Sequence, residues 1–167
     1  MKTPLEETTP IFRFKGFTLL EMLVVLGIIG ILTSLGIASY SSYNASQVLQ
    51  SNAENVATEL AYAKSRAISQ VIPTSCGSIS LTGYEVDVVP NSQQYTLSAI
   101  CGSPRIISTD NLPSQIRFST GTTKSVLFAV STGIPSATAT IQIDSYGGTN
   151  SVAVKVNTAG TISIQPD

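Results

Sequence analysis

The sequence predicts an α+β fold in which one long N-terminal helix precedes a β-rich domain. Three observations support this assignment. An uninterrupted apolar run fills residues 22–32, and residues 49–71 then carry apolar side chains at every third or fourth position, as a helix with one buried face does. After Pro73 the apolar positions alternate instead, which is typical of strands. The 167 residues therefore suit one modest domain with an N-terminal extension.

Composition argues against several functional classes. Charged residues make up 11% of the chain, and its net charge is −1. Histidine is absent, which removes the usual general base and the commonest metal ligand. After residue 16 there are six basic and eight acidic residues and no basic stripe, so the sequence does not favour binding to nucleic acid. We therefore predict a protein that is not an enzyme and that needs no cofactor or metal.

The N-terminal region predicts a membrane-spanning segment behind a short leader. Residues 1–16 are polar, and Arg13 and Lys15 stand directly before the apolar run. Residues 17–40 would extend about 36 Å as a helix, enough to cross a hydrocarbon core of about 30 Å. The preceding cations place the leader in the cytoplasm and the rest outside, in a single-pass protein of the inner (cytoplasmic) membrane. Glu21 conflicts with this reading, because a charge at the centre of a membrane helix costs about 2.5–3.5 kcal/mol.

The helical pattern continues through residues 41–72, the predicted amphipathic half of the helix. No proline interrupts the chain between Pro10 and Pro73, so one helix of about 50 residues is expected. The glycines in its first half weaken it, and whether it is loosened near Gly30 and Gly36 stays open. The predicted buried stripe consists of Leu49, Ala53, Val56, Leu60, Ala63, Ala67 and Val71.

Residues 73–167 are predicted to form a β-rich globular head with an antiparallel sheet packed on the helix. An even pair of cysteines in an exported chain indicates a disulfide between Cys76 and Cys101, with two free thiols as the alternative. Asp144, in the segment DSYGGTN, could suggest a calcium loop, but one carboxylate is weak support and we predict a hairpin turn. The expected strands are residues 84–89, 94–100, 125–130, 140–144, 151–156 and 161–164.

The order of residues around Glu21 is specific. The stretch KGFTLLEMLVVLGIIGIL resembles the class III signal of type IV pilins and of the pseudopilins of type II secretion. The resemblance lies in the basic residue before Gly16, in Phe17 and Thr18 after it, and in Glu21 before a run of Leu, Val and Ile. It implies that a prepilin peptidase cleaves between Gly16 and Phe17 and N-methylates Phe17. The apolar segment is then retained.

The resemblance also implies a role for Glu21. Its carboxylate would pair with the new α-amino group of Phe17 on a neighbouring subunit when the N-terminal helices stack into a filament. The implied partners are the prepilin peptidase, other pilin or pseudopilin subunits and the inner-membrane assembly machinery. The head would end up outside the cytoplasm, in an extracellular pilus or a periplasmic pseudopilus.

A second, weaker resemblance covers the rest of the chain. Segments such as ELAYAKSRAISQVIPTSC, a turn with Phe118 and Gly121, and a late hairpin with Gly160 are similar to the H-type minor pseudopilin and related minor pilins. This resemblance implies a pilin-like pair of sheets and favours a minor pilin or pseudopilin. The alternatives are a major pilin, or a secreted or membrane-tethered β-domain whose ordinary signal is kept as an anchor or cut near residues 36–38.

Overall fold

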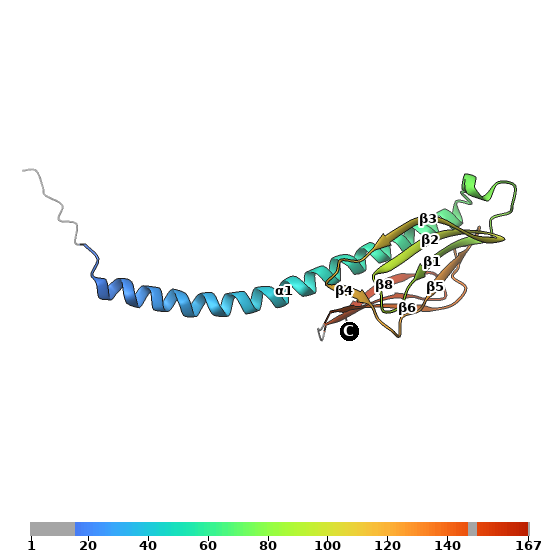
Figure 1. Ribbon diagram of the computed structural model, residues 1–167. Helices are drawn as coiled ribbons and strands as arrows, with labels where there is room; N and C mark the ends of the chain where they lie inside the picture. The colour runs from blue at the N-terminus through green and yellow to red at the C-terminus, as the bar shows by residue number, and fades with distance from the viewer. Residues whose placement is uncertain (1–15, 147–149, 167) are drawn as a thin grey trace, which may run out of the picture. The chain divides into compact units, whose positions relative to one another are not determined.

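The computed structural model describes residues 16–146 and 150–166, except for the side chains of residues 34–39, 41, 42 and 166. Apart from Gly16, the predicted leader lies outside these ranges. The chain divides into two units, Met1–Ser41 and Ser42–Asp167. One helix is followed by antiparallel sheets, which confirms the predicted α+β class (Figure 1). The elements are α1 (Leu19–Ile68), η1 (Thr74–Cys76), β1 (Gly83–Val88), β2 (Gln94–Cys101), β3 (Ser103–Asn111), β4 (Ile116–Phe118), β5 (Ser125–Ala129), β6 (Ala139–Ser145), β7 (Ser151–Val156) and β8 (Ile162–Pro166).

Helix α1 is continuous over 50 residues and ends with a defined C-terminal motif. The N–H of Val71 donates to the carbonyl of Arg66, and the N–H of Gln70 donates to the carbonyl of Ala67. Gln70 has a φ of 51°, the left-handed conformation that this motif requires. The helix therefore ends at Ile68, whereas the sequence predicted an end at residue 72. The earlier end was not predicted because Gln70 occupies the left-handed position at which glycine usually marks the end of a helix.

The second half of α1 buries one face in the core. Six of the seven predicted positions are buried, at spacings of four and three residues. The prediction for Val71 is wrong: it lies beyond the helix and is 39% exposed, because the chain has already turned at Gln70. The six buried residues are Leu49, Ala53, Val56, Leu60, Ala63 and Ala67.

The strands form two four-stranded antiparallel sheets. Sheet A has the order β3-β2-β1-β5, and sheet B has the order β4-β6-β7-β8. They stack as two layers, with the second half of α1 alongside (Figure 1). The largest buried side chains, Tyr84, Phe118 and Phe128, come from both sheets and fill one core together with α1. Tyr95 of sheet A meets Phe118 of sheet B edge to face at 6.0 Å.

All six predicted strands are present, with small differences at their ends, and β7 has the predicted bounds. Strands β3 and β4 were not predicted. Every residue of β3 is exposed or half-buried, so no alternation marks it in the sequence. Strand β4 has only three residues. Each of these two strands lies at the end of its sheet.

Gly83 allows strands β1 and β5 to approach closely. A Cβ atom at this position would overlap the backbone oxygen of Phe128, whereas a Cβ at Gly121 would meet nothing within 4 Å. We expect Gly83→Ala to lower the free energy of unfolding by about 1–3 kcal/mol, as overpacking does. Gly121→Ala, the matched control, should change it by less than about 0.5 kcal/mol. Urea unfolding of both variants tests this, and equal effects would contradict it.

Candidate functional site

The residues of the predicted signal lie at the start of α1: Gly16, Phe17 and Thr18 precede the helix, and Glu21 lies in its first turn. Thr18 precedes the helix, and its Oγ1 accepts a hydrogen bond from the N–H of Glu21 at 3.2 Å. This places Thr18 as the N-cap and Glu21 as the third helical residue, the two ends of a capping-box sequence. This capping role was not predicted, although the spacing Thr-x-x-Glu is a sequence signal for it. Glu21 therefore supports the helix start through its backbone and its favourable position at the helix N-terminus.

The carboxylate of Glu21 is not used within the described part of the chain. No cation among the described residues lies within 4 Å of it, and no hydrogen bond to its oxygens occurs there. Its side chain is exposed, and Phe17 beside it is 74% exposed. An acid with no partner among the described residues thus stands one helical turn from the predicted new N-terminus.

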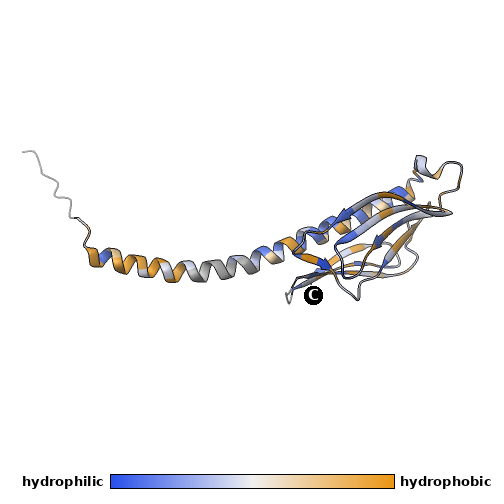
Figure 2. Ribbon diagram, in the orientation of Figure 1, coloured by the Kyte–Doolittle hydropathy of each residue, from blue (hydrophilic) through white to orange (hydrophobic). Residues whose placement is uncertain are grey.

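The first turns of α1 consist almost entirely of hydrophobic residues, with Glu21 as the charged exception (Figure 2). Exposure of the large apolar side chains between Leu19 and Leu32 ranges from 44% to 82%. The hydroxyl of Thr33 donates to the carbonyl of Ile29 at 2.7 Å, so this polar group is satisfied within the helix. A helix that is apolar all round requires cover from lipid or from other helices.

In the described ranges, no helix meets the combined length and hydropathy requirement for crossing a membrane. The predicted span of residues 17–40 includes side chains at 34–39, which lie outside the described residues. The predicted span therefore stays a prediction.

The structure joins Cys76 and Cys101 in a disulfide, as the sequence predicted, and both residues are buried. The Cα atoms are 5.6 Å apart, within the usual range for such a bond. The bond links η1, in the loop after α1, to the end of β2. The hydroxyl of Tyr84, at the start of β1, donates to the carbonyl of Val71 in the same loop. The disulfide and this hydrogen bond therefore fix the loop between α1 and β1 to sheet A.

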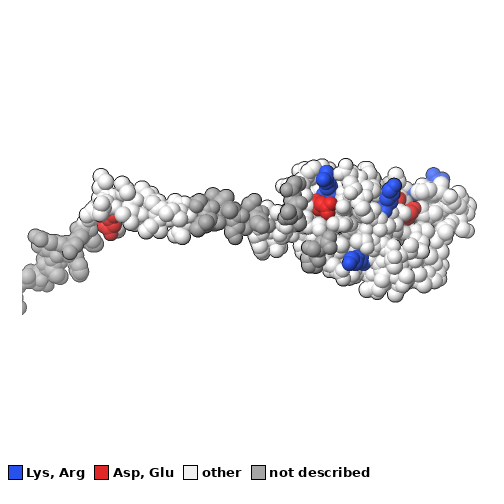
Figure 3. All heavy atoms as spheres, turned by 90° about the horizontal axis from the view of Figure 1, so that it is seen from below, with Lys and Arg blue, Asp and Glu red and all other residues white. Residues whose placement is uncertain are grey.

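Charged side chains of the head are dispersed. On the face seen in Figure 3, charged residues are few, and basic residues are interspersed with acidic ones. Arg66 lies over the ring of Tyr62, and Arg117 lies 4.8 Å above the ring of Tyr146. Within the described residues, no lysine or arginine comes within 4 Å of a carboxylate. The prediction that the head does not bind nucleic acid is not tested by this geometry and stays a prediction.

Asp144 lies in strand β6, immediately before the segment predicted as a turn. It lies opposite Arg117 of β4 in the sheet, and its Oδ1 is buried with no hydrogen-bond partner among the described residues. The turn itself, residues 147–149, lies outside the described residues. Over the described ranges, no three acidic or cysteine side chains are grouped in a way that could hold a metal ion.

Three similarities to known proteins bear on this N-terminal segment and on the fold of the head. Residues 11–37 match the prokaryotic N-terminal methylation motif. Over 85 residues the chain is 34% identical to a type IV major alpha-pilin of Moraxella bovis, across 47% of this chain and 54% of that relative. The chain thus spans about half the length of the curated relative that it matches. The minor pseudopilin EpsH from the type 2 secretion system of Vibrio cholerae shares the fold, with a TM-score of 0.53 and 14% identity over 71% of this chain and 96% of that one.

The chain is thus similar to pilins and pseudopilins in its N-terminal motif, in part of its sequence and in its fold. These similarities support the resemblance that the signal motif indicated. The likeness to EpsH also confirms the expected pilin-like arrangement of one long helix and antiparallel sheets.

The disulfide of this pilin-like protein should contribute substantially to stability. It closes a loop with a sequence separation of 25 residues, for which the chain-entropy model gives about 3 kcal/mol. We expect a Cys76→Ala/Cys101→Ala variant to lose about this much free energy of unfolding. Thermal unfolding with and without reductant measures it. The bond would be contradicted if reduction of the denatured protein left its mass unchanged and reductant left the melting temperature of the folded protein unchanged.

The outer face of sheet A predicts a pH dependence. Burial, and secondarily the neighbouring carboxylate of Glu85, raise the pKa of Asp87 above 3.8. A raised pKa means that Asp87 favours the folded state while protonated, and that this contribution is lost as pH rises through its folded pKa. Asp87→Asn should therefore increase the free energy of unfolding at pH 7 but not below pH 3.8. Urea unfolding at both pH values tests this, with the exposed Asp110→Asn as control.

Proposed function

We propose that this protein is a non-catalytic structural subunit of a type IV pilus or of a type II secretion pseudopilus. A prepilin peptidase cleaves it between Gly16 and Phe17 and N-methylates Phe17. It then assembles through its N-terminal helix with other pilin or pseudopilin subunits and the inner-membrane machinery. The observation that carries this proposal is an apolar, exposed helical segment inside a methylation motif. Its first turn holds Glu21, whose carboxylate has no partner among the described residues.

The physical role proposed for Glu21 is to select the axial register of the helices. Cleavage creates an α-amino cation at Phe17, which stays protonated near neutral pH after methylation. An ion pair in an apolar environment is strong, but desolvation offsets much of this gain. A lone carboxylate is therefore costly at every axial offset except the one at which it meets a neighbour's Phe17. In this proposal the apolar side chains of α1 hold neighbouring helices together, and Glu21 determines their axial offset.

The proposed location follows from the same segment. Residues 17–40 hold the subunit in the inner membrane before assembly, with residues 1–16 on the cytoplasmic side and the head outside. Thr33 does not oppose this placement, because its hydroxyl is already bonded to the carbonyl of Ile29. After assembly the head lies in an extracellular pilus or a periplasmic pseudopilus.

Within this class we propose a minor pilin or pseudopilin. The likeness in fold to a minor pseudopilin covers 96% of that chain, which supports this assignment. A major pilin is the alternative, because the curated relative in sequence is a major alpha-pilin. The number of copies of the protein per fibre, measured in sheared fibres by quantitative mass spectrometry, distinguishes the two.

Substitution of Glu21 tests the proposed register mechanism. Glu21→Ala should leave cleavage intact, since Thr18 still caps the helix, but should reduce incorporation into fibres by at least about tenfold, given the strength of buried ion pairs. Glu21→Asp keeps the charge and should retain more incorporation. The measurements are N-terminal sequencing, with methyl-phenylalanine at residue 17 expected, and subunit content of purified fibres. Normal incorporation of Glu21→Ala would contradict the mechanism, and a mature chain beginning at Ser39 would contradict the function.

A further inference from the structure

The four sheet edges of the head differ in how they are protected. The outer edge of β5 is occupied by residues 133–136, through hydrogen bonds such as that from the N–H of Ser136 to the carbonyl of Leu127. The outer edge of β4 is bonded to residues 91–92. Strand β3 is interrupted by a register shift opposite Leu97/Ser98 and carries Pro104 and Arg105. Bulges, proline and charge are the usual protections of an exposed edge.

The edge of β8 has none of these features between Ile162 and Gln165. The N–H of Asn157 donates to the carbonyl of Thr161, which sets the alternation of the β7–β8 ladder. By this alternation Ser163 exchanges hydrogen bonds with β7, while Ile162 and Ile164 direct their backbone N–H and C=O groups away from it. In the described part of the chain, neither Ile162 nor Ile164 has a backbone hydrogen bond to a residue outside the two strands.

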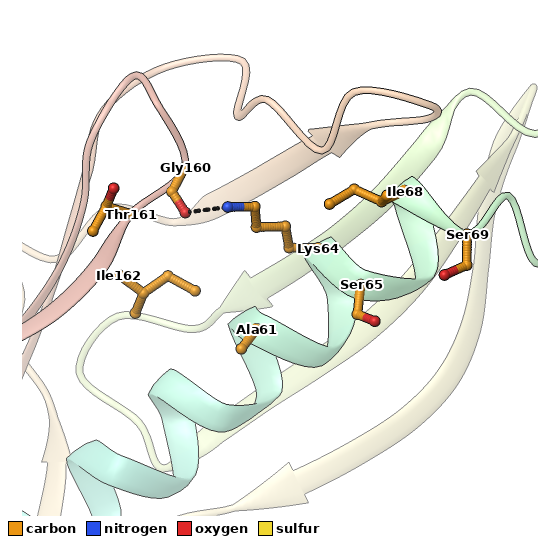
Figure 4. Close-up of a pocket in the computed structure, with 8 residues that line it drawn as sticks. All are labelled: Ala61, Lys64, Ser65, Ile68, Ser69, Gly160, Thr161 and Ile162. Carbon is orange, nitrogen blue, oxygen red and sulfur yellow. Dashed lines mark hydrogen bonds between the residues drawn. The ribbon is translucent and has the colours of Figure 1, made fainter.

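A groove runs between this edge and the second half of α1. One part has a volume of about 460 Å³, and its lining residues include Lys64, Ser65, Gly160 and Ile162 (Figure 4). A second part, of about 310 Å³, shares Ala61 and Ile162 with the first and continues along β8 to Ile164. The helix wall is low because Ala57, Ala61 and Ser65 have small side chains. The groove is therefore continuous along the open backbone edge.

The two ends of the groove carry opposite charges. Lys64 lies at one end, where its Nζ donates to the carbonyl of Gly160 at 2.8 Å, as Figure 4 shows. Lys64 is half-buried, and no carboxylate of the described residues lies within 4 Å of its ammonium group. None of those residues therefore neutralises its charge. Glu54 lines the other end. An occupant with an acidic group at the Lys64 end would complement both the charge and the backbone edge.

We propose that this groove receives an extended segment from the head of a neighbouring subunit, which adds to β8 as a fifth strand of sheet B and places a carboxylate beside Lys64. The proposal rests on the proposed function, because fibre assembly is what brings a second head alongside. Strand addition provides backbone hydrogen bonds to Ile162 and Ile164, and the Lys64 contact determines which segment fits.

A matched pair of variants tests the open edge. The full-length protein is expressed in fibre-producing cells with a photo-crosslinking benzoylphenylalanine in place of Gln165, an exposed residue on the face of β8 that does not line the groove, and adducts with other subunits are mapped by mass spectrometry. Ile164→Pro removes the outward N–H without breaking a bond to β7, whereas Ile164→Ala removes only the side chain. We expect at least a tenfold loss of adducts in Ile164→Pro relative to Ile164→Ala. Equal yields in the two variants would overturn strand addition.

A second pair keeps the test decisive if Ile164→Pro does not fold. Lys64→Gln removes the cation but can still donate to Gly160, and Lys64→Arg keeps the cation. Loss of adducts in Lys64→Gln with retention in Lys64→Arg supports the proposal, and unchanged adducts in both overturn it. Processing at Phe17 and the subunit content of fibres are measured in the same cells. Unprocessed or unincorporated parent protein refutes the proposed function, whereas normal incorporation without adducts at residue 165 refutes the groove alone.

Discussion

Burial of one face of α1 against both sheets is the contact on which the rest of the head depends. A two-layer sandwich of four strands each leaves side chains exposed where the layers part, and the second half of α1 covers the core there. Its buried residues are mostly alanine, valine and leucine, which allow the helix to lie close to the sheets. The hydroxyl of Ser108 on β3 donates to Glu59 on one flank, and Ile162 of β8 lines the groove on the other. The helix thereby determines which strand edges are left open.

Sequence patterns predicted the features whose side chains alternate between core and solvent. The α1 stripe and strand β7 were predicted because burial imposes a period of about 3.6 or of 2 on the choice of residues. Strand β3 could not be predicted in this way, since an exposed edge imposes no such pattern. The end of α1 was missed for a related reason: Gln70 adopts a left-handed conformation that glycine normally signals, and the hydrogen bonds that stabilise it involve only backbone groups.

The candidate site was predicted by residue identity rather than by periodicity. Phe17, Thr18 and Glu21 form a specific order that hydropathy alone would treat as a flaw in an apolar segment. The geometry adds that Thr18 caps the helix through the backbone of Glu21, which leaves the carboxylate oxygens available. The cap uses the backbone N–H of Glu21, and the proposed pairing would use its carboxylate. A substitution of its side chain can affect assembly without removing the helix start.

Two kinds of register would then meet in one fibre. The proposed ion pair between Glu21 and the amine of a neighbouring Phe17 would select one axial offset of the helices. A strand added to β8 can shift only in steps of two residues, about 6.8 Å, because a shift of one residue turns each side chain to the opposite face. The two contacts reinforce each other only if the helix offset coincides with an allowed strand register. A subunit with the same N-terminal helix but a different head would match the helix offset and would not match the strand register at β8. Both the head and the N-terminal helix would therefore contribute to the choice of neighbour.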